Sequence, residues 1–243
     1  MSMGFPLYLA MTAAEAAACG KFPQKAAWMA CHFSAYGSGL CNFPEDIPAG
    51  SMLILNDRMP VQGHDPEAVA RQLWEAAEHI QAERVLLDFQ RPGCPDAILQ
   101  AILKSAVCPV AVTEDYGKDL DCPLFLPPPK PHIPLKTYLK DYEGREIWLE
   151  VSCGQETVTV TADGSKLTLG TEVPEAFSDN MLHCHYDIAV SKDQAVFRLG
   201  RTREDVTALL KEAETLGVTC AVGLYQELRL SREPQSKLRE AEP

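Results

Sequence analysis

The chain alternates between short apolar runs and longer stretches with a helical pattern. Eight such runs recur, at residues 6–11, 27–34, 51–57, 84–90, 108–114, 122–127, 146–151 and 218–225. Each is short enough to be a strand and is followed by a turn. Strands that are apolar on both faces are typical of a parallel sheet covered on both sides. The pattern therefore predicts eight buried parallel strands.

Several segments between these runs carry apolar residues at helical spacing. One begins after Asp65, one follows Pro95, and one extends from Thr202 to Gly217, with a weaker helix at 135–143. Strands that alternate with helices imply right-handed crossovers and a parallel sheet. With eight candidate strands we expect a TIM-like (β/α)8 barrel. An open, doubly wound sheet is the alternative.

Residues 155–170 break this rhythm. They alternate with period two around Asp163-Gly164, which is a strong hairpin signal. A second hairpin is predicted from 185–190 and 194–200. We expect both to form an antiparallel insertion near the seventh strand, either as a lid or in place of a helix.

The expected organisation is a single domain. Residues 1–230 would form the barrel, with the hairpin insertion at about 152–200, and 231–243 would be a polar C-terminal tail without an apolar stripe. A length of 243 residues suits one barrel, which usually has about 250. No Gly/Ser linker divides the chain.

Composition narrows the class of protein. The net charge is −12, with 22 Lys and Arg against 34 acids, which argues against binding nucleic acid. Nine cysteines without a CxxC pair suit reduced thiols in a reducing compartment. No apolar run reaches the ~20 residues that span a bilayer. We therefore expect a cytoplasmic protein with a small-molecule ligand and no membrane partner; the sequence does not indicate the oligomeric state.

Polar residues end several of the apolar runs, where a barrel places its site. They are Asn56, Asp57, Asp88, Gln90, Glu114, Asp115, Glu150, Tyr225 and Gln226, with His32, Ser34 and Tyr36 around the end of the second run. Ordinary solvation of a strand end is the competing explanation at each position. We interpret Asp57, Asp88 and Glu114 as candidate catalytic carboxylates. The candidate ligand-binding residues are Gln90, His32, Tyr36, Asn56 and Tyr225.

The fourth run carries a resemblance to a known family. Its segment VLLDFQ is similar to part of the DxxDxDxE signature that ends the fourth strand of chitinase-type barrel glycosidases, glycoside hydrolase family 18. Asp88 matches the Asp that supports the catalytic acid, whereas Gln90 stands where that Glu acid should be and Leu86 replaces a further Asp. An amide has no labile acidic proton near neutral pH. The resemblance thus implies a chitinase-like fold that has lost its usual acid, and either sugar binding alone or hydrolysis by relocated carboxylates.

Relocation requires two carboxyl groups about 5–10 Å apart. Asp57, Asp88 and Glu114 would end the third, fourth and fifth strands, and adjacent strands lie about 4.8 Å apart. Crowding of like charges would raise one pKa and supply an acid. Ion pairs with Arg58 and Arg91 are an alternative, purely structural explanation. The hypothesis is a glycoside-hydrolase-like barrel that acts on or binds a carbohydrate or another small polar ligand.

A metal-dependent hydrolase is an alternative of a different class. His183 and His185 flank Cys184 and would share one face of a strand, a spacing that metal sites use, and Asp187 continues that face. Without a third ligand of matching spacing, the pair equally suits the exposed side of a hairpin. No cofactor is expected, and the sequence contains no GxGxxG or GxxxxGK motif for a nucleotide. It also contains no GxSxG motif for a serine nucleophile.

Overall fold

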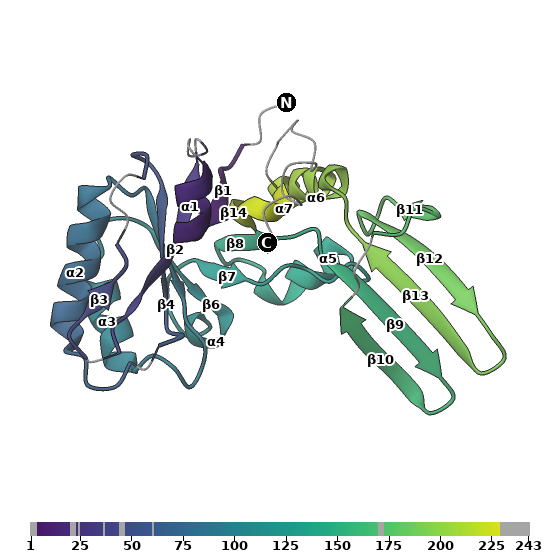
Figure 1. Ribbon diagram of the computed structural model, residues 1–243, viewed down its shortest axis with the longest axis horizontal. Coiled ribbons are helices and arrows are strands. Elements are labelled where there is room, and N and C mark those ends of the chain that lie inside the picture. Colours follow the sequence, from purple (N-terminus) through teal and green to yellow (C-terminus); the bar gives the residue numbers. More distant parts are fainter. Residues whose placement is uncertain are drawn as a thin grey trace, which may run out of the picture.

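Eight parallel strands form a closed barrel within the part of the chain that the structure describes (Figure 1). The computed structural model describes residues 4–19, 23, 25–35, 37–43, 47–59, 61–169 and 173–228. The barrel strands are β1 (Leu7–Met11), β2 (Ala26–Phe33), β4 (Met52–Asn56), β5 (Arg84–Asp88), β6 (Val110–Thr113), β7 (Leu124–Leu126), β8 (Ile147–Val151) and β14 (Val218–Leu224). Pairing between β1 and β2 closes the barrel. The predicted TIM-like barrel is confirmed, and each predicted apolar run overlaps one of its strands.

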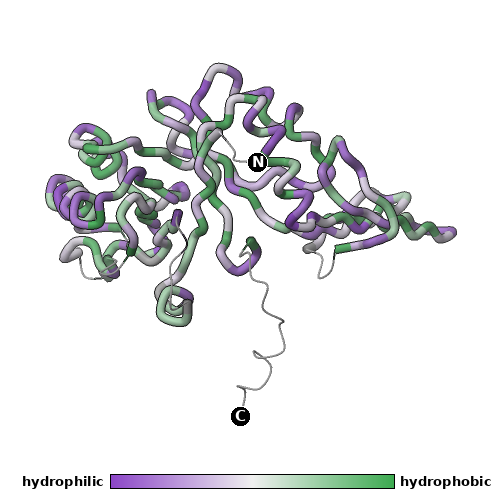
Figure 2. The backbone as a smooth tube through the Cα atoms, turned by 90° about the horizontal axis from the view of Figure 1, so that it is seen from above, coloured by the Kyte–Doolittle hydropathy of each residue, from purple (hydrophilic) through white to green (hydrophobic). Residues whose placement is uncertain are grey.

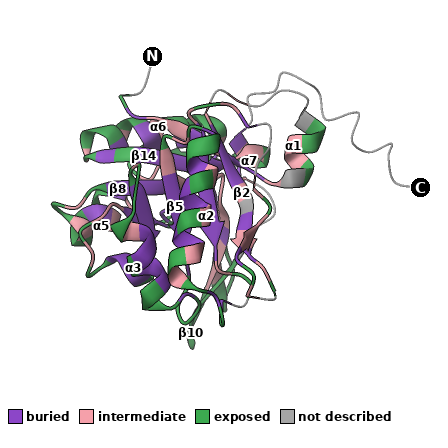
Figure 3. Cartoon of the chain, turned by 90° about the vertical axis from the view of Figure 1, so that its left-hand side faces the viewer, coloured by how far each residue is buried: buried purple, intermediate pink, exposed green. Residues whose placement is uncertain are grey.

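Helices cover the outer face of the barrel. They are α1 (Ala13–Cys19), α2 (Pro66–His79), α3 (Asp96–Lys104), α4 (Glu114–Gly117), α5 (Leu135–Leu139) with the 3₁₀ helix η1 (Lys140–Tyr142), α6 (Arg203–Thr215) and α7 (Tyr225–Leu228). Figure 3 shows buried strands behind helices whose outer sides are exposed. The predicted helices are confirmed, although the weak one splits into α5 and η1. The short helices α1, α4 and α7 were not predicted, because none is long enough to show a stripe.

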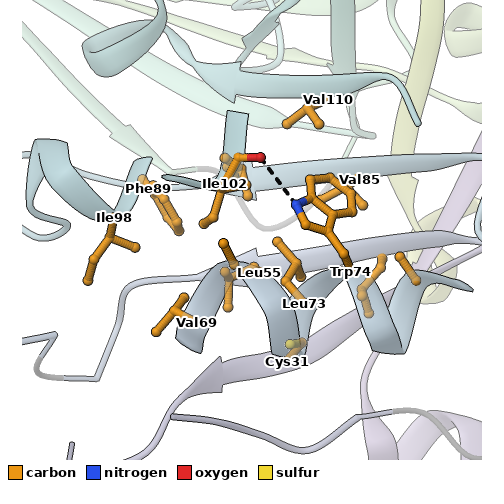
Figure 4. Close-up of a cluster of buried hydrophobic side chains, with 14 of the residues drawn as sticks. Cys31, Leu55, Val69, Leu73, Trp74, Val85, Phe89, Ile98, Ile102 and Val110 are labelled. Atoms are coloured by element: carbon orange, nitrogen blue, oxygen red, sulfur yellow. Dashed lines mark hydrogen bonds between the residues drawn. The ribbon is translucent and has the colours of Figure 1, made fainter. Parts of the chain in front are cut away.

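The layer between the barrel and helices α2 and α3 is a packed apolar core (Figure 4). Trp74 of α2 is 5% exposed, and its indole Nε1 donates a hydrogen bond to the carbonyl oxygen of Ile102, 3.2 Å away on α3. Leu55 of β4 and Val85 of β5 face this layer from the barrel. Because the strands are buried on this side as well as inside, their sequences are apolar throughout rather than alternating.

Alternate residues of the strands fill the barrel interior. Tyr8, Met52, Leu86 and Trp148 belong to this inner cluster and are at most 1% exposed. The cluster also includes small residues, such as Ala10, whose size leaves space toward the carboxyl ends of the strands. A packed floor below an open mouth is therefore a consequence of which residues point inward.

A second, antiparallel sheet is inserted between β8 and α6. Its strands are β9 (Gln155–Thr161), β10 (Gly164–Leu169), β11 (Phe177–Asp179), β12 (Cys184–Val190) and β13 (Gln194–Gly200), in the order β10-β9-β13-β12-β11. Both predicted hairpins are present, and pairing of β13 with β9 joins them into one sheet. Figures 1 and 2 show this sheet extending from one side of the barrel. A further two-residue strand, β3 (Leu40–Cys41), pairs antiparallel with β2.

Arg201 links the inserted sheet to the barrel through hydrogen bonds. Its side chain is 1% exposed and donates hydrogen bonds to four main-chain carbonyl oxygens. Two belong to the loop after β7, at Pro129 and Lys130, and two precede β12, at Leu182 and His183. One buried guanidinium thus holds two segments that are remote in sequence.

Two further features bear on the sequence-based expectations. The described cysteine side chains are all free, in agreement with reduced thiols. Within the described residues, no helix is long and apolar enough to span a membrane. The expected tail at 231–243 lies outside the described residues.

Candidate functional site

A cavity of about 380 Å³ opens at the carboxyl ends of the barrel strands. Its inner wall is apolar and includes Ile54, Leu86, Phe125 and Val222, one from each of four strands. Its polar lining residues are Asn56, Arg58, Asp88, Gln90 and Glu150. Small-molecule sites commonly measure about 300–1,000 Å³ and combine apolar walls with a few polar groups. The mouth of this barrel has that character.

Glu150 is the most perturbed carboxyl group of this cavity. It lies on β8 two residues after the buried Trp148, and therefore on the same inward-facing side of the strand. Its pKa is raised from 4.5 to about 7, first by burial and then by the negative charges of Asp88 and Glu227, while the positive charge of Arg58 opposes the rise. A substantial fraction of Glu150 is consequently protonated near neutral pH, which is the state that a general acid requires.

Asp88 ends β5 and lies in the same cavity. Burial raises its pKa, and the negative charge of Asp57 adds to this, whereas the guanidinium of Arg58 lowers it. The closest approach of Arg58 to the Asp88 carboxylate is 3.9 Å. The site therefore holds two carboxyl groups that interact, Asp88 and Glu150, and the positive charge of Arg58 lies beside Asp88.

Gln90 and Asn56 line the cavity as the sequence predicted, but the amide of Asn56 is already engaged. Its Nδ2 donates to the carbonyl oxygens of Met29 and Cys31, at 3.3 and 3.1 Å, and its Oδ1 accepts from the main-chain N–H of Arg58. These bonds hold β2 where its register with β4 shifts. Asn56 thus shapes the wall through the backbone.

Asp57 and Glu114 are not among the described residues that line the cavity. The Asp57 carboxylate accepts a hydrogen bond from the main-chain N–H of Gln90 at 2.9 Å, and so fixes the loop after β5. Gly93 of that loop must lack a side chain, because a Cβ there would lie 2.1 Å from Asp57 Oδ2. Glu114 pairs with Lys118 at 2.8 Å, which lowers its pKa. The structure therefore places Asp88 and Glu150 in one cavity, whereas Asp57, whose charge still acts on Asp88, turns its carboxylate to the loop after β5.

The remaining predicted site residues lie elsewhere. His32 is on β2, opposite Asn56 of β4 and Cys41 of β3, and Tyr225 begins α7 and packs against the outer core. Neither is among the described lining residues of the cavity. Tyr36 lies outside the described residues.

The alternation of side chains along a strand distinguishes Glu150, which faces the cavity, from Asp57, which does not. On β4, Ile54 points inward, so Asn56 does also and Asp57 does not. On β8, Trp148 points inward, so Glu150 follows it into the cavity. Glu150 was recognised from the sequence as a polar strand end but was not selected as a site residue. Applying the period-two rule to every strand would have selected it.

The two histidines of the metal hypothesis contact separate carboxylates on α6. His183 precedes β12 with a φ of 46°, outside extended geometry, and its Nε2 lies 2.6 Å from Glu212 Oε2. His185 Nδ1 lies 2.7 Å from Asp205 Oδ2. Among the described residues there is no group of three His, Cys, Asp or Glu side chains that could hold a metal ion. These contacts favour a structural role for both histidines.

The raised pKa of Glu150 predicts a dependence of stability on pH. The native state retains a proton that the unfolded chain releases between its ordinary pKa of 4.5 and about 7, so the free energy of unfolding falls as pH rises through this window. Glu150→Gln should not show this loss. Between pH 4 and pH 8, its free energy of unfolding should therefore rise by roughly 2–3 kcal/mol relative to that of the wild type. Urea unfolding at both pH values measures it. Glu114→Gln serves as the control, because its pKa is lowered and it should not reproduce the gain at pH 8.

Comparison with known proteins identifies the same barrel fold elsewhere. No protein-family model and no curated protein sequence matches this chain. The spore cortex-lytic enzyme SleL of Bacillus cereus aligns with a TM-score of 0.56 and 10% identity over 93% of this chain and 71% of its own. SleL of Bacillus megaterium QM B1551 aligns with a TM-score of 0.53 and 7% identity, over 89% and 69%.

A third structure aligns along nearly its whole length. The C-terminal domain of a predicted chitinase from Desulfitobacterium hafniense DCB-2 has a TM-score of 0.52 and 11% identity, over 92% of this chain and 94% of that domain. The chain shares the barrel fold of these three structures. At such low identities the likeness concerns the fold, and it confirms the fold implied by the resemblance at the fourth strand.

Proposed function

We propose that the chain is a glycoside-hydrolase-like barrel that binds a carbohydrate at its mouth and cleaves a glycosidic bond there with Glu150 and Asp88. The observation that carries this proposal is that two carboxyl groups from different strands share one cavity with an amide and a guanidinium. Two carboxyl groups on either side of the scissile bond are the usual requirement for this hydrolysis. The barrels of similar fold include two spore cortex-lytic enzymes and a predicted chitinase, which supports a sugar as the ligand.

Each carboxyl group has a role suited to its surroundings. Glu150 retains a proton near neutral pH and would donate it to the glycosidic oxygen as the bond to the anomeric carbon breaks. Asp88, whose charged form is favoured by Arg58 at 3.9 Å, would stabilise the positive charge that develops on the sugar ring. Water then supplies the hydroxyl group that replaces the leaving sugar, and its remaining proton restores the acid.

The lining of the cavity suits a sugar. A pyranose ring presents C–H groups on its faces and hydroxyl groups around its edge. The apolar wall that includes Phe125 and Leu86 can contact the ring faces, and Gln90 and Arg58 can hydrogen-bond to hydroxyl groups. Gln90, which stands where the resemblance places the acid, would thus bind the substrate rather than protonate it.

A sugar-binding barrel without catalysis is the second candidate. The observation that favours it is Gln90 itself, because the position that the resemblance assigns to the acid holds an amide. The two candidates differ in whether Glu150 serves as a replacement acid.

A panel of chromogenic glycosides, including N-acetylglucosaminides and their short oligomers, separates the two. We expect turnover of at least one glycoside, with inhibition by the corresponding free sugar. Binding of oligosaccharides measured by calorimetry in the absence of turnover would favour the non-catalytic barrel. Absence of both across the panel would contradict the assignment to carbohydrate.

A further inference from the structure

The inserted antiparallel sheet has one apolar face. Cross-strand partners point to the same side of a sheet, and the pairing aligns four apolar residues in one row. This row consists of Leu167, Val158, Phe197 and Ile188. The adjacent row on the same side, toward the tips of the hairpins, contains Val160, Ala195 and Val190 along with Ser165. We call this side the apolar face; Phe177, whose ring stacks on Tyr186 at 5.4 Å, extends it.

The opposite side of the same sheet is polar. Arg198 and Asp187 face each other there as an ion pair of 2.8 Å, next to Thr157. The following row contains Thr159 and Lys166 together with the small apolar residues Val196 and Ala189. The two sides therefore differ in the way that is typical of a sheet with one face in water and the other against a second layer.

The apolar face is nevertheless open to solvent. Its exposed members are Val190 (76%), Phe177 (56%), Ile188 (46%), Leu167 (45%) and Val160 (39%). Burial is confined to the end nearest the barrel, where Leu199 is 8% and Glu156 is 9% exposed. An apolar sheet face is normally covered by another layer of structure, so these exposures indicate an absent partner.

The size of this patch matches one half of a protein interface. The exposed members and the half-buried Val158, Phe197 and Tyr186 together present roughly 600 Å² of apolar surface, at the upper end of what a monomer leaves exposed. Each partner in a stable protein–protein interface contributes about 600–1,000 Å². The apolar face is large enough for a partner with an equivalent surface.

Charge directs a contact between two copies of the chain to the apolar face. With a net charge of −12, two copies repel each other over most of their surfaces. The apolar face carries one charged side chain, Glu156, which is buried beside His132 at 2.9 Å, so contact between two such faces brings no exposed like charges together. The net charge of −12 disfavours binding of the chain to an anionic membrane. The sequence at 229–243 contains no run of apolar residues that would match this face.

The two edge strands of the inserted sheet disfavour pairing with another sheet, so association is expected at the apolar face. One edge strand, β11, is three residues long, and the other, β10, carries Lys166. Short edge strands and edge lysines disfavour edge-to-edge pairing. The remaining arrangement is face-to-face packing, in which two sheets lie about 10 Å apart and their side chains interdigitate.

We propose that two copies of this chain pack the apolar faces of their inserted sheets together, forming a symmetric dimer in which each barrel mouth belongs to its own copy. The contact is isologous, so Ile188 and Val190 of both copies lie within one shared core. Dimerisation is independent of the chemistry proposed at the mouth.

Light scattering after size exclusion tests this over a range of concentrations. We expect the wild-type chain to elute at twice its chain mass at ~100 µM. Ile188→Lys should be monomeric, since it places two like charges in the shared core. Ala189→Lys is the matched control, because Ala189 is the next residue on the same strand, is exposed, and faces the polar side; it should remain dimeric. Unchanged circular dichroism and thermal unfolding would establish that the variants fold.

Three outcomes would overturn the proposal. The first is a wild-type chain that stays monomeric at ~100 µM. The second is a dimer that survives Ile188→Lys, which would place the contact on another surface. The third is a monomer that sediments with vesicles of neutral phospholipid and loses this binding in Ile188→Lys, which would assign the apolar face to a membrane instead.

Discussion

Replacing Glu150 by Gln should lower kcat/KM for a hydrolysed glycoside by about 10²–10⁴-fold, the usual contribution of a general acid. The substitution preserves size and removes the proton that Glu150 retains near neutrality. The effect should fall mainly on kcat, because the amide can still contact a bound sugar. Initial rates at several substrate concentrations measure both parameters.

The pH profile provides an independent check on this role. Activity should decline as pH rises above about 7, where Glu150 loses its proton. A substrate with a very acidic leaving group needs little protonation and should lose less activity in Glu150→Gln. Glu114→Gln is the control, since that carboxylate pairs with Lys118 away from the described cavity lining and should retain near wild-type rates. Full activity in Glu150→Gln would remove Glu150 from the chemistry.

Replacing Arg201 by Met should destabilise the fold by about 3–5 kcal/mol, because each buried acceptor left without a donor costs about 1–3 kcal/mol. Four carbonyl oxygens that accept from its guanidinium would lose a donor in a buried place. The loss should concentrate where the inserted sheet meets the loop after β7. Urea unfolding gives the total, and hydrogen exchange of β12 and β13 locates it.

Arg198→Met is the matched control for this experiment. Arg198 is on β13, three residues before Arg201, and forms an ion pair with Asp187, but its side chain is 53% exposed. Exposed pairs contribute about 0–1 kcal/mol, so this variant should unfold close to wild type. Equal losses in the two variants would contradict the role assigned to Arg201.

The origin of the fold is largely local. The eight apolar runs and the hairpin turn at Asp163-Gly164 depend on neighbouring residues, and both were predictable for that reason. The pairing of β13 with β9 was not, because Gly200 and Gln155 meet across 45 positions of sequence and no nearby pattern reports it. The short helix α4 was also missed, since Glu114 begins a single turn that shows no periodicity.

In the candidate site, too, some residues could be predicted from neighbouring sequence and others could not. Asp88 and Gln90 were recognisable because they lie two residues apart at the end of one strand, in phase with Leu86. Glu150 comes 60 positions after Gln90, and its place beside them follows from closure of the barrel. Asp57 also ends a strand, but its side chain turns to the loop at Gln90 instead of the cavity.

The sequence by itself determined that this chain forms a barrel of parallel strands with polar ends, because strand period and apolar content act over a few residues. The tertiary structure alone decided which polar ends meet, and which of them retains a proton near neutral pH. The physical reason is that burial and charge at Glu150 are sums over β5, β8 and the loops around them, segments that only the closed barrel brings within reach of one another.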